Sequence, residues 1–275
     1  MNVQTTPANT PDLATVKTRQ QAAWSTGNYP LVGVTLQITG ERLAEAMDLH
    51  PDARVLDVAA GNGNATLAAA RRFCNVVSTD YVGAWLKAGM ARAEAERLEV
   101  AFREADAEDL PFEDGSFDAV TSTFGVMFTA NQEAAASELT RVCRSGGRIG
   151  LINWTPESFV GQLFRTIGQH VPPPAGVRSP LEWGTEKRIE ELFNSSSRAI
   201  EFNRKHFTFR FRSAEHWIEL WRDAYGPMNK AFEAVGESGS AALEADLASL
   251  AREHSQDDTA MIVPSEYAEI IIHRS

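Results

Sequence analysis

Residues 55–64 read VLDVAAGNGN, an apolar run that ends in a turn with two glycines. The run predicts a buried β-strand, and the segment from Ala65 onward predicts a helix directly after the turn. Gly61 and Gly63 permit positive φ angles and carry no Cβ, so the backbone can approach a ligand closely. The unpaired N–H groups at the start of the following helix favour an anionic group above the turn. This order of strand, glycine turn and helix predicts a site for a nucleotide-like ligand.

The glycine turn fits a dinucleotide only in part. The dinucleotide pattern G-x-G-x-x-G/A needs a third small residue, and this chain has Thr66 there. Asp57, at the end of the predicted strand, would repel a pyrophosphate but could hold an ammonium group by a charge-assisted hydrogen bond. S-adenosylmethionine, with an amino acid at one end and a nucleoside at the other, meets both demands. The alternative is that Asp57 only caps the start of the helix.

Two more acidic residues end the next two predicted strands. Asp80 follows Gly63 at close to the roughly 20-residue offset at which an acid meets ribose hydroxyls in such folds. Asp106 ends a strand that begins near residue 100, where it could accept a hydrogen bond from an adenine amine while the N–H of Ala107 donates to a ring nitrogen. Open α/β sheets bind ligands at the carboxyl ends of their strands. Three such acids therefore predict one shared site.

The chain carries a series of short motifs, which are DVAAGNG at 57–63, Asp80, DAEDLPF at 106–112, SFDAV at 116–120 and RVCRSGGR at 141–148. In this order they resemble the motifs of class I S-adenosylmethionine-dependent methyltransferases, in the small-molecule branch that includes enzymes of the ubiquinone and menaquinone type. The resemblance covers about residues 50–154. Ala59 stands where the family usually has its first glycine, a mild change that narrows the turn.

The resemblance implies a cofactor-binding role for each residue that matches a family motif. These residues are Asp57, Ala59, Gly61, Gly63, Asp80, Tyr81, Asp106, Ala107, Thr123 and Phe124. Those of the first motif would hold the methionine end of S-adenosylmethionine. Asp80 would bind the ribose hydroxyls, with Tyr81 beside the adenine. The residues after the third and fourth strands would address the adenine edge and the cleft near the sulfonium.

The resemblance also implies an α/β fold, a Rossmann-like and mostly parallel sheet of seven strands with helices on both faces and a C-terminal antiparallel hairpin. Helical and strand patterns alternate along the chain, which predicts right-handed crossovers. Within one compact unit we expect disorder at residues 1–10, a helical segment or lid at 1–50, the cofactor-binding core at 51–154, and the end of the sheet with cap insertions at 155–275.

The last part of the chain departs from simple alternation. Residues 206–212 alternate polar and aromatic side chains, and residues 267–272 form an apolar run, so both predict strands. Residues 214–252 predict helix, with a break near Gly226. The segment 214–262 is long for a simple connection, and we expect it to form a cap over the acceptor site.

Composition limits the class of protein. The formal net charge of −11 argues against a nucleic-acid substrate, because phosphate backbones favour basic surfaces. No apolar run reaches 18 residues, so no membrane partner is expected. Cys74 and Cys143 are too few for a disulfide framework, and no two histidines have metal-binding helical spacing. We expect a reduced, cytoplasmic protein without a metal, as a monomer or a homodimer.

The sequence contains no motif that identifies a catalytic base. Methyl transfer from a sulfonium needs a base only if the acceptor loses a proton. His170 and His206 are the histidines to test, although a structural role is the commoner one. Four aromatic residues, Trp183, Trp217, Trp221 and Tyr225, could wall an apolar acceptor pocket or simply pack in the core.

Three functions stay open at this point. A small-molecule methyltransferase acting on oxygen, nitrogen or carbon is preferred. A nicotinamide-dependent oxidoreductase is disfavoured by Thr66 and by the acid at Asp57. A protein that binds S-adenosylmethionine without transferring its methyl group is the third, since a fold does not fix a reaction.

Overall fold

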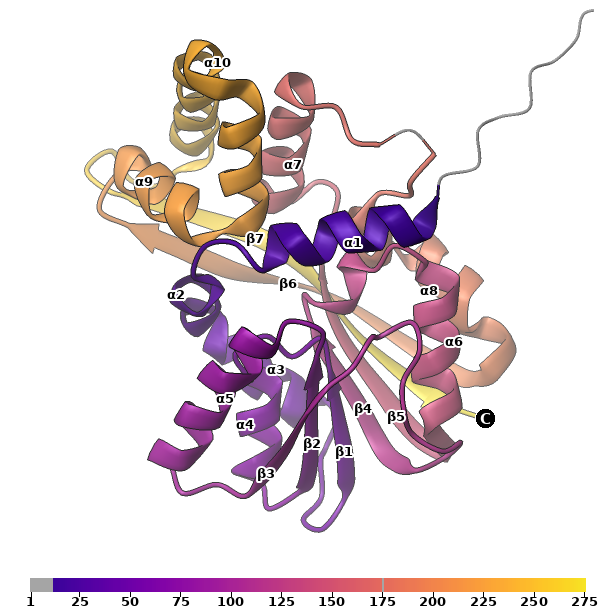
Figure 1. Cartoon of the computed structure of the whole chain (residues 1–275). Helices are drawn as coiled ribbons and strands as arrows, with labels where there is room; N and C mark the ends of the chain where they lie inside the picture. The colour runs from indigo at the N-terminus through magenta and orange to yellow at the C-terminus, as the bar shows by residue number, and fades with distance from the viewer. Residues whose placement is uncertain (1–11, 175) are drawn as a thin grey trace, which may run out of the picture.

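A sheet of seven strands in the order β3-β2-β1-β4-β5-β7-β6 organises the computed structural model, which describes residues 12–174 and 176–275 (Figure 1). The strands are β1 (Arg54–Val58), β2 (Asn75–Asp80), β3 (Val100–Glu104), β4 (Phe117–Thr123), β5 (Cys143–Trp154), β6 (Ser197–Phe211) and β7 (Met261–Arg274). The disorder expected for residues 1–10 lies outside the described residues.

The strands β1 to β5 run parallel, and β7 lies antiparallel between β5 and β6. The predicted seven-stranded sheet with its closing hairpin is therefore confirmed. Residues 55–58 of β1 are buried on both faces, which explains their unbroken apolar character. From β1 the chain builds outward to β2 and β3 on one side, and later to β4 and β5 on the other. The strand order thus reverses between β1 and β4, where open α/β sheets bind ligands.

Helices cover both faces and the carboxyl end of the sheet. Figure 1 shows α3, α4 and α5 on one side, α6 and α8 on the other, and α7, α9 and α10 beyond the carboxyl ends of the parallel strands. The helices are α1 (Leu13–Trp24), α2 (Tyr29–Gly33), α3 (Gln37–Ala46), α4 (Asn64–Ala70), α5 (Gly83–Ala95), α6 (Gln132–Val142), α7 (Phe159–His170), α8 (Glu186–Phe193), α9 (Ala214–Ala224) and α10 (Gly226–His254). Within the described ranges, no helix is both long and apolar enough to cross a membrane.

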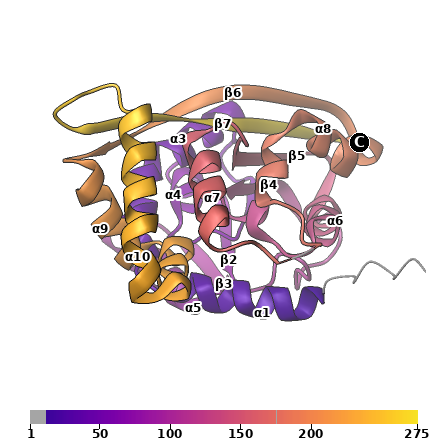
Figure 2. The same cartoon turned by 90° about the horizontal axis from the view of Figure 1, so that it is seen from above.

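Helix α1 crosses the carboxyl end of the sheet, and α7 packs beside α10, as the view from above shows (Figure 2). The break expected near Gly226 lies between α9 and α10, where Pro227 occupies the first turn of α10. A second kink falls at Gly236, whose φ of 63° is incompatible with a helix. The segment predicted to be a cap therefore consists of helical pieces, of which α10 packs between α9 and α7.

The closing hairpin is longer than its sequence pattern indicated. Strand β6 begins at Ser197 rather than near residue 206, and β7 begins at Met261 rather than near residue 267. The first half of β6 is mostly exposed and pairs only with β7, so no buried face imposes an alternating pattern on it. Period-two alternation marks a strand only where one of its faces is buried.

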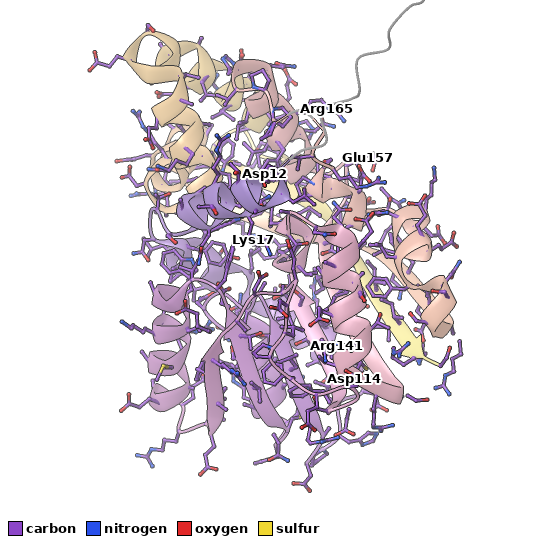
Figure 3. The ribbon with its side chains drawn as sticks, turned by 45° about the vertical axis from the view of Figure 1, so that its right-hand side comes forward. Asp12, Lys17, Asp114, Arg141, Glu157 and Arg165 are labelled. Carbon is purple, nitrogen blue, oxygen red and sulfur yellow. The ribbon has the colours of Figure 1, made fainter. Side chains whose placement is uncertain are left out.

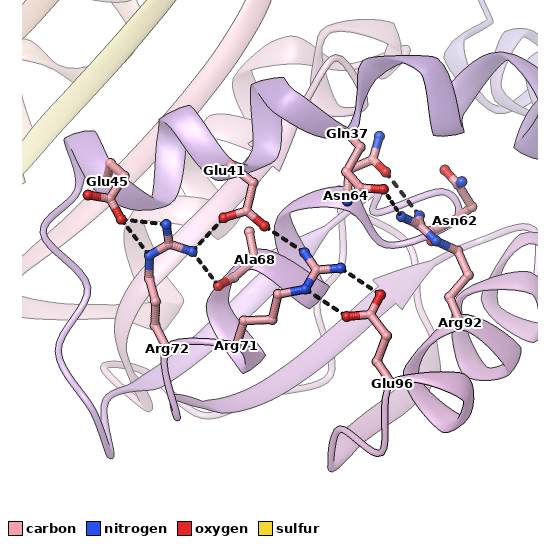
Figure 4. A network of polar contacts seen from close by, with 10 residues as sticks. All are labelled: Gln37, Glu41, Glu45, Asn62, Asn64, Ala68, Arg71, Arg72, Arg92 and Glu96. Carbon is pink, nitrogen blue, oxygen red and sulfur yellow. Dashed lines mark hydrogen bonds and ion pairs between the residues drawn. The ribbon is translucent and has the colours of Figure 1, made fainter.

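An ion-pair network joins α3, α4 and α5 on one face of the sheet (Figure 4). Arg71 contacts Glu41 and Glu96, each at 2.6 Å. Arg72 contacts Glu41 at 2.8 Å and also pairs with Glu45. Both arginines stand at the end of α4, so the network holds that helix between its two neighbours. The opposite end of α4 faces the site described next.

The two cysteines are buried, unpaired thiols, as expected. Burial raises the pKa of Cys143 to about 12, and burial also raises the pKa of Cys74. Both thiols therefore stay protonated and act as small apolar side chains of the core.

Candidate functional site

A cavity of about 860 Å³ lies at the carboxyl ends of β1, β2 and β4, beneath α1. Its walls come from the glycine turn, the ends of these strands, the loop after β3, and α1. Eight of the predicted site residues line it, which are Ala59, Gly61, Asp80, Tyr81, Asp106, Ala107, Thr123 and Phe124. The two others, Asp57 and Gly63, lie behind the wall. The strand ends thus bring most of the predicted residues to one hollow.

Asp57 points away from the cavity and is fully buried. Its carboxylate accepts hydrogen bonds from the backbone N–H of Thr66 at 2.8 Å, from the hydroxyl of Thr66 at 2.6 Å and from the hydroxyl of Thr121 at 3.0 Å. Burial raises its pKa to about 6, although these hydrogen bonds act in the opposite direction. The structure corrects the interpretation of Asp57 as a direct ammonium anchor, because its oxygens are engaged inside the fold. It is a local cap of α4.

The glycine turn uses backbone conformations that side chains resist. Gly61 has φ of 58°, and a Cβ placed on it would lie 2.9 Å from Cε1 of Tyr29. Gly63 has φ of 84° and precedes α4. Ala59 also has a positive φ, 51°, so it adopts a left-handed conformation in which a glycine would be unstrained. The departure from the family pattern therefore places a small strain at the turn without blocking the cavity.

Asp80 joins the end of β2 to the glycine turn at the wall of the cavity. Its carboxylate accepts hydrogen bonds from the N–H of Gly61 and of Val82, both at 2.8 Å. Asp80 is only 6% exposed, and burial raises its pKa to about 6. A deprotonated Asp80 keeps lone pairs for donors from a bound ligand.

Asp106 is engaged by a residue that the sequence analysis did not identify. Lys17 of α1 lies 2.6 Å from Asp106 and 2.6 Å from Glu108, on the side of the helix that faces the sheet (Figure 3). Partial burial lowers the pKa of Lys17, but its hydrogen bonds to the two carboxylates outweigh this, so the net shift is upward. Lys17 thus stays charged and ties α1 to the loop after β3.

Two further contacts fasten α1 over the cavity. The side-chain amide of Gln21 donates to the backbone carbonyl of Tyr81 at 2.8 Å. The indole N–H of Trp85 donates to the backbone carbonyl of Trp24 at 3.1 Å. The predicted N-terminal segment therefore supplies part of the wall, although its sequence shows only a polar helix with a single buried residue, Val16.

Asn62 presents an unsatisfied donor at the glycine turn. Its side chain is 2% exposed and lines the cavity, yet its Nδ2 has no hydrogen-bond partner among the described residues. Arg92 holds the turn by donating to the carbonyl of Asn62 at 2.7 Å and to Oδ1 of Asn64 at 2.9 Å (Figure 4). Buried amide donors are nearly always satisfied. The Nδ2 atom itself lies behind the cavity wall, so other atoms of this residue line the cavity.

A second hollow of about 330 Å³ adjoins the first, and we call it the aromatic chamber. Its walls are Trp24, Tyr29, Val32, Leu36, Phe124, Phe128, Trp154, Val160, Phe209, Trp221 and Tyr225. Of the four aromatic residues considered from sequence, Trp221 and Tyr225 line this chamber, whereas Trp183 and Trp217 are fully buried in the core. Among the described residues that form the chamber wall, none is charged.

Phe124 stands between the two hollows in a strained conformation. Its φ is 57°, in the left-handed region that bulky residues avoid. Its ring stacks on Trp154 with centroids 4.1 Å apart, and its N–H donates to the carbonyl of Ile152 at 2.7 Å. Such strain persists where the surroundings hold it in place, often at functional sites.

The two candidate histidines lie outside both hollows. His170, on α7, pairs with Asp246 at 2.7 Å. His206 is exposed on β6, where its backbone carbonyl accepts from Arg42 at 3.2 Å. Neither lines a cavity in the part of the chain that the structure describes, so neither can serve there as a base. Over the same residues, no group of three His, Cys, Asp or Glu side chains is placed to hold a metal ion.

The sequence of the cavity-bearing part is similar to that of known proteins. A family model described as a methyltransferase domain matches residues 56–151. An uncharacterized protein of Mycobacterium tuberculosis is 38% identical over 245 residues, which are 87% of this chain and 89% of that protein. A demethylmenaquinone methyltransferase of Deinococcus radiodurans is 32% identical over 192 residues, which are 64% of this chain and 78% of that enzyme.

Solved structures share the fold at lower identity. The YcgJ protein of Bacillus subtilis has a TM-score of 0.60 and 19% identity, covering 88% of this chain and 99% of that one. A geranyl diphosphate methyltransferase, solved in complex with S-adenosylmethionine, has a TM-score of 0.53 and 16% identity, covering 87% of this chain and 85% of that one. At these identities the likeness shows the fold alone.

Proposed function

Because this chain belongs to the class I S-adenosylmethionine-dependent methyltransferase family, we propose that it transfers a methyl group from S-adenosylmethionine to a small-molecule acceptor by in-line displacement. The observation that carries the proposal is the cavity at the strand ends, where the glycine turn, Asp80 and Asp106 line one hollow. It is partly covered by α1 and lies where the strand order reverses, the place at which open α/β sheets bind ligands.

The cavity residues suit the chemical groups of S-adenosylmethionine. At one end, the glycine turn with Gly61 and Asn62 would face the methionine part of the cofactor. In the middle, Asp80 would accept from the ribose hydroxyls, since a carboxylate can accept more bonds than its two present ones. At the far end, Asp106 and Ala107 would address the adenine edge, with Lys17 sharing the carboxylate.

The methyl group of S-adenosylmethionine is already activated, so the protein mainly has to position the two reactants. S-adenosylmethionine supplies a methyl group on a sulfonium, so the acceptor lone pair forms the new bond while the electrons of the S–CH₃ bond return to sulfur. The chain contributes position: aligning two reactants can account for roughly 7–11 kcal/mol of a barrier. Phe124 forms a wall common to both hollows, and Lys17, Gln20 and Trp24 of α1 line the cavity.

The net charge and the two cysteines support a class of acceptor and a cellular compartment. A net charge of −11 and two adjoining hollows support a small-molecule acceptor over a nucleic acid. The relative named demethylmenaquinone methyltransferase agrees with an acceptor of small size. Two buried, unpaired thiols are consistent with a reducing compartment, for which we propose the cytoplasm.

Calorimetric titration with S-adenosylhomocysteine and, separately, with NAD tests the cofactor. We expect the first to bind and the second not to bind; the reverse result would assign the chain to nicotinamide chemistry. Incubation of a metabolite extract with methyl-labelled S-adenosylmethionine then tests the reaction. A labelled metabolite is expected, heavier than its precursor by one methylene. Tight cofactor binding without any labelled product would instead indicate a binding protein.

A further inference from the structure

The aromatic chamber lies directly against the cofactor cavity. Trp24, Tyr29, Phe124 and Phe128 form walls of both hollows. A molecule in the chamber would therefore touch the same side chains as one in the cavity. Reacting atoms need to meet at van der Waals distance in a displacement reaction. If the methyl transfer proposed above is the function, the chamber is the place from which an acceptor can reach the methyl group.

The chamber wall restricts the acceptor to an uncharged, apolar molecule. The described residues that form the wall carry no carboxylate, ammonium, guanidinium or imidazole group. A charged ligand would lose its hydration without gaining an ionic partner, which is costly in an apolar enclosure. Eight of the eleven wall residues are aromatic, and a ring compound packs well against such side chains.

Two tyrosine hydroxyls are the exception to the apolar lining of the chamber. Tyr225 is 5% exposed and lines the chamber, and Tyr29 lines both hollows. Burial raises the pKa of both tyrosines well above the ordinary value, with Asp80 adding to the shift at Tyr29 and Tyr29 adding to that at Tyr225. Both hydroxyls therefore stay neutral and able to donate.

We propose that the aromatic chamber binds the methyl acceptor, and that this acceptor is an uncharged ring compound held through one oxygen or nitrogen by the hydroxyls of Tyr29 and Tyr225. The aromatic walls bind the ring by apolar contact, and the hydroxyls orient it. Buried donors in such a chamber need a partner, and a carbonyl, ether or ring nitrogen of the ligand provides one.

The same lining determines which acceptor atoms can react. Neutral tyrosines are poor bases, and the chamber wall offers no other base among the described residues. The acceptor must therefore attack as a neutral molecule, through a lone pair or an electron-rich carbon. The new Nu–CH₃ bond takes the acceptor's electron pair, and the S–CH₃ pair stays on sulfur. Any proton on the acceptor leaves to water after the transfer.

Calorimetric titrations of the full chain saturated with S-adenosylhomocysteine test this assignment. The probes are α-tetralone, tetralin and α-naphthoate, which share a fused-ring size but differ in their polar group. We expect the ketone to bind best, the hydrocarbon to bind roughly three- to tenfold more weakly because it lacks a hydrogen bond, and the anion not to bind.

Matched variants assign the effect to the chamber. Tyr225→Phe should make the ketone bind as weakly as the hydrocarbon, whereas Tyr267→Phe, at a buried tyrosine outside the chamber, should keep the difference. Val160→Phe, which fills the chamber, should abolish binding of both neutral probes with unchanged affinity for S-adenosylhomocysteine. Tyr29→Phe gives a second test of the hydroxyl pair if Tyr225→Phe does not fold.

The outcomes separate this inference from the function on which it rests. Binding of S-adenosylhomocysteine without binding of either neutral probe would overturn the chamber assignment and leave the methyltransferase proposal intact. Binding of α-naphthoate as tightly as α-tetralone would show that the acceptor class is wrong. An equal preference for the ketone in wild type and in both tyrosine variants would exclude the hydroxyls. Failure of S-adenosylhomocysteine to bind would instead reject the methyltransferase proposal.

Discussion

At the scale of single residues, similar side chains at the strand ends have different tasks. Asp57 and Asp80 end neighbouring strands, and burial raises the pKa of each to about 6. Asp57 is turned into the fold by two threonines, whereas Asp80 remains at the cavity wall. The two can therefore be separated experimentally, one by stability and the other by affinity.

Replacing Asp80 with asparagine should weaken the binding of S-adenosylhomocysteine by about 1.5–3 kcal/mol, the scale of a hydrogen bond to a charged group. The side chain keeps its size but loses its charge and one acceptor oxygen. Calorimetry measures the effect. Asp118→Asn is the control, because Asp118 bonds Arg54 and Arg144 near the start of β4, away from the cavity. Unchanged affinity in Asp80→Asn would mean that the ribose assignment is wrong.

Replacing Asp57 with alanine should lower the free energy of unfolding by about 1–3 kcal/mol, because the N–H of Thr66 loses its partner inside the fold. Affinity for S-adenosylhomocysteine should change far less than in Asp80→Asn. Chemical denaturation measures the first quantity and calorimetry the second. A large loss of affinity with unchanged stability would restore Asp57 as a direct ligand of the cofactor.

Cofactor affinity should depend on pH through Asp80. Above pH 7 the carboxylate is ionised and accepts hydrogen bonds, so affinity should be constant. As pH falls through about 6, protonation removes an acceptor site, and affinity should decrease by up to about tenfold per pH unit. Titrations from pH 5 to 8 measure this. The dependence should vanish in Asp80→Asn but persist in Asp57→Asn, although Asp57 has a pKa in the same range.

At the scale of elements, α1 is held over the cavity by a few polar contacts and by one aromatic residue at its end, Trp24. Only Val16 of this helix is buried. Lys17 and Gln21 provide the side-chain contacts to the loops beneath. Lys17 and Asp106 are each about a third exposed, and an ion pair exposed to this extent contributes little stability, about 0–1 kcal/mol. A helix fastened in this way can open at modest cost, as a cover over a ligand site must.

Lys17→Met should therefore speed the release of S-adenosylhomocysteine severalfold and leave the melting temperature nearly unchanged. The substitution keeps the length of the side chain and removes both ion pairs. Stopped-flow displacement measures release, and hydrogen exchange at the amides of α1 reports opening. Lys187→Met, at an exposed lysine of α8, is the control. Equal release rates in the two variants would show that the ion pairs do not hold α1 closed.

The elements around the glycine turn could be predicted from sequence, while the aromatic chamber could not. A buried parallel strand has a continuous apolar run, so the sequence of residues 55–58 predicts strand β1. The chamber draws on segments far apart in the chain, such as Trp24, Phe124 and Trp221. Trp217 and Trp221 lie four residues apart in a helical pattern, so their sequence context is the same, yet Trp217 packs in the core. Only the tertiary arrangement decides which of the two lines a cavity.

Asp57 shows why a motif does not fix a role. Its position at a strand end predicted a contact with the ligand, but the outcome depended on Thr121, which comes from the neighbouring strand β4. Asn62 shows the converse. No local pattern distinguishes it in the turn, and only the folded structure places it in the cavity wall.

At the scale of the whole molecule, the last strand is indispensable to the sheet. Strand β7 pairs with β5 on one side and β6 on the other, and its apolar residues Val263, Ile270 and Ile272 are fully buried. A chain that ends at residue 260 should therefore lose cooperative unfolding, as measured by circular dichroism on heating. A chain that lacks only Ser275 is the control. A cooperative transition in the shorter chain would show that the parallel half folds alone.

Helix α1 also bears on the kinetics of turnover. Trp24, at its last residue, belongs to the walls of both hollows. If this helix opens during the proposed methyl transfer, the two hollows become accessible in the same event. Neither product then has to leave before the other, so we expect random-order inhibition patterns rather than an ordered mechanism.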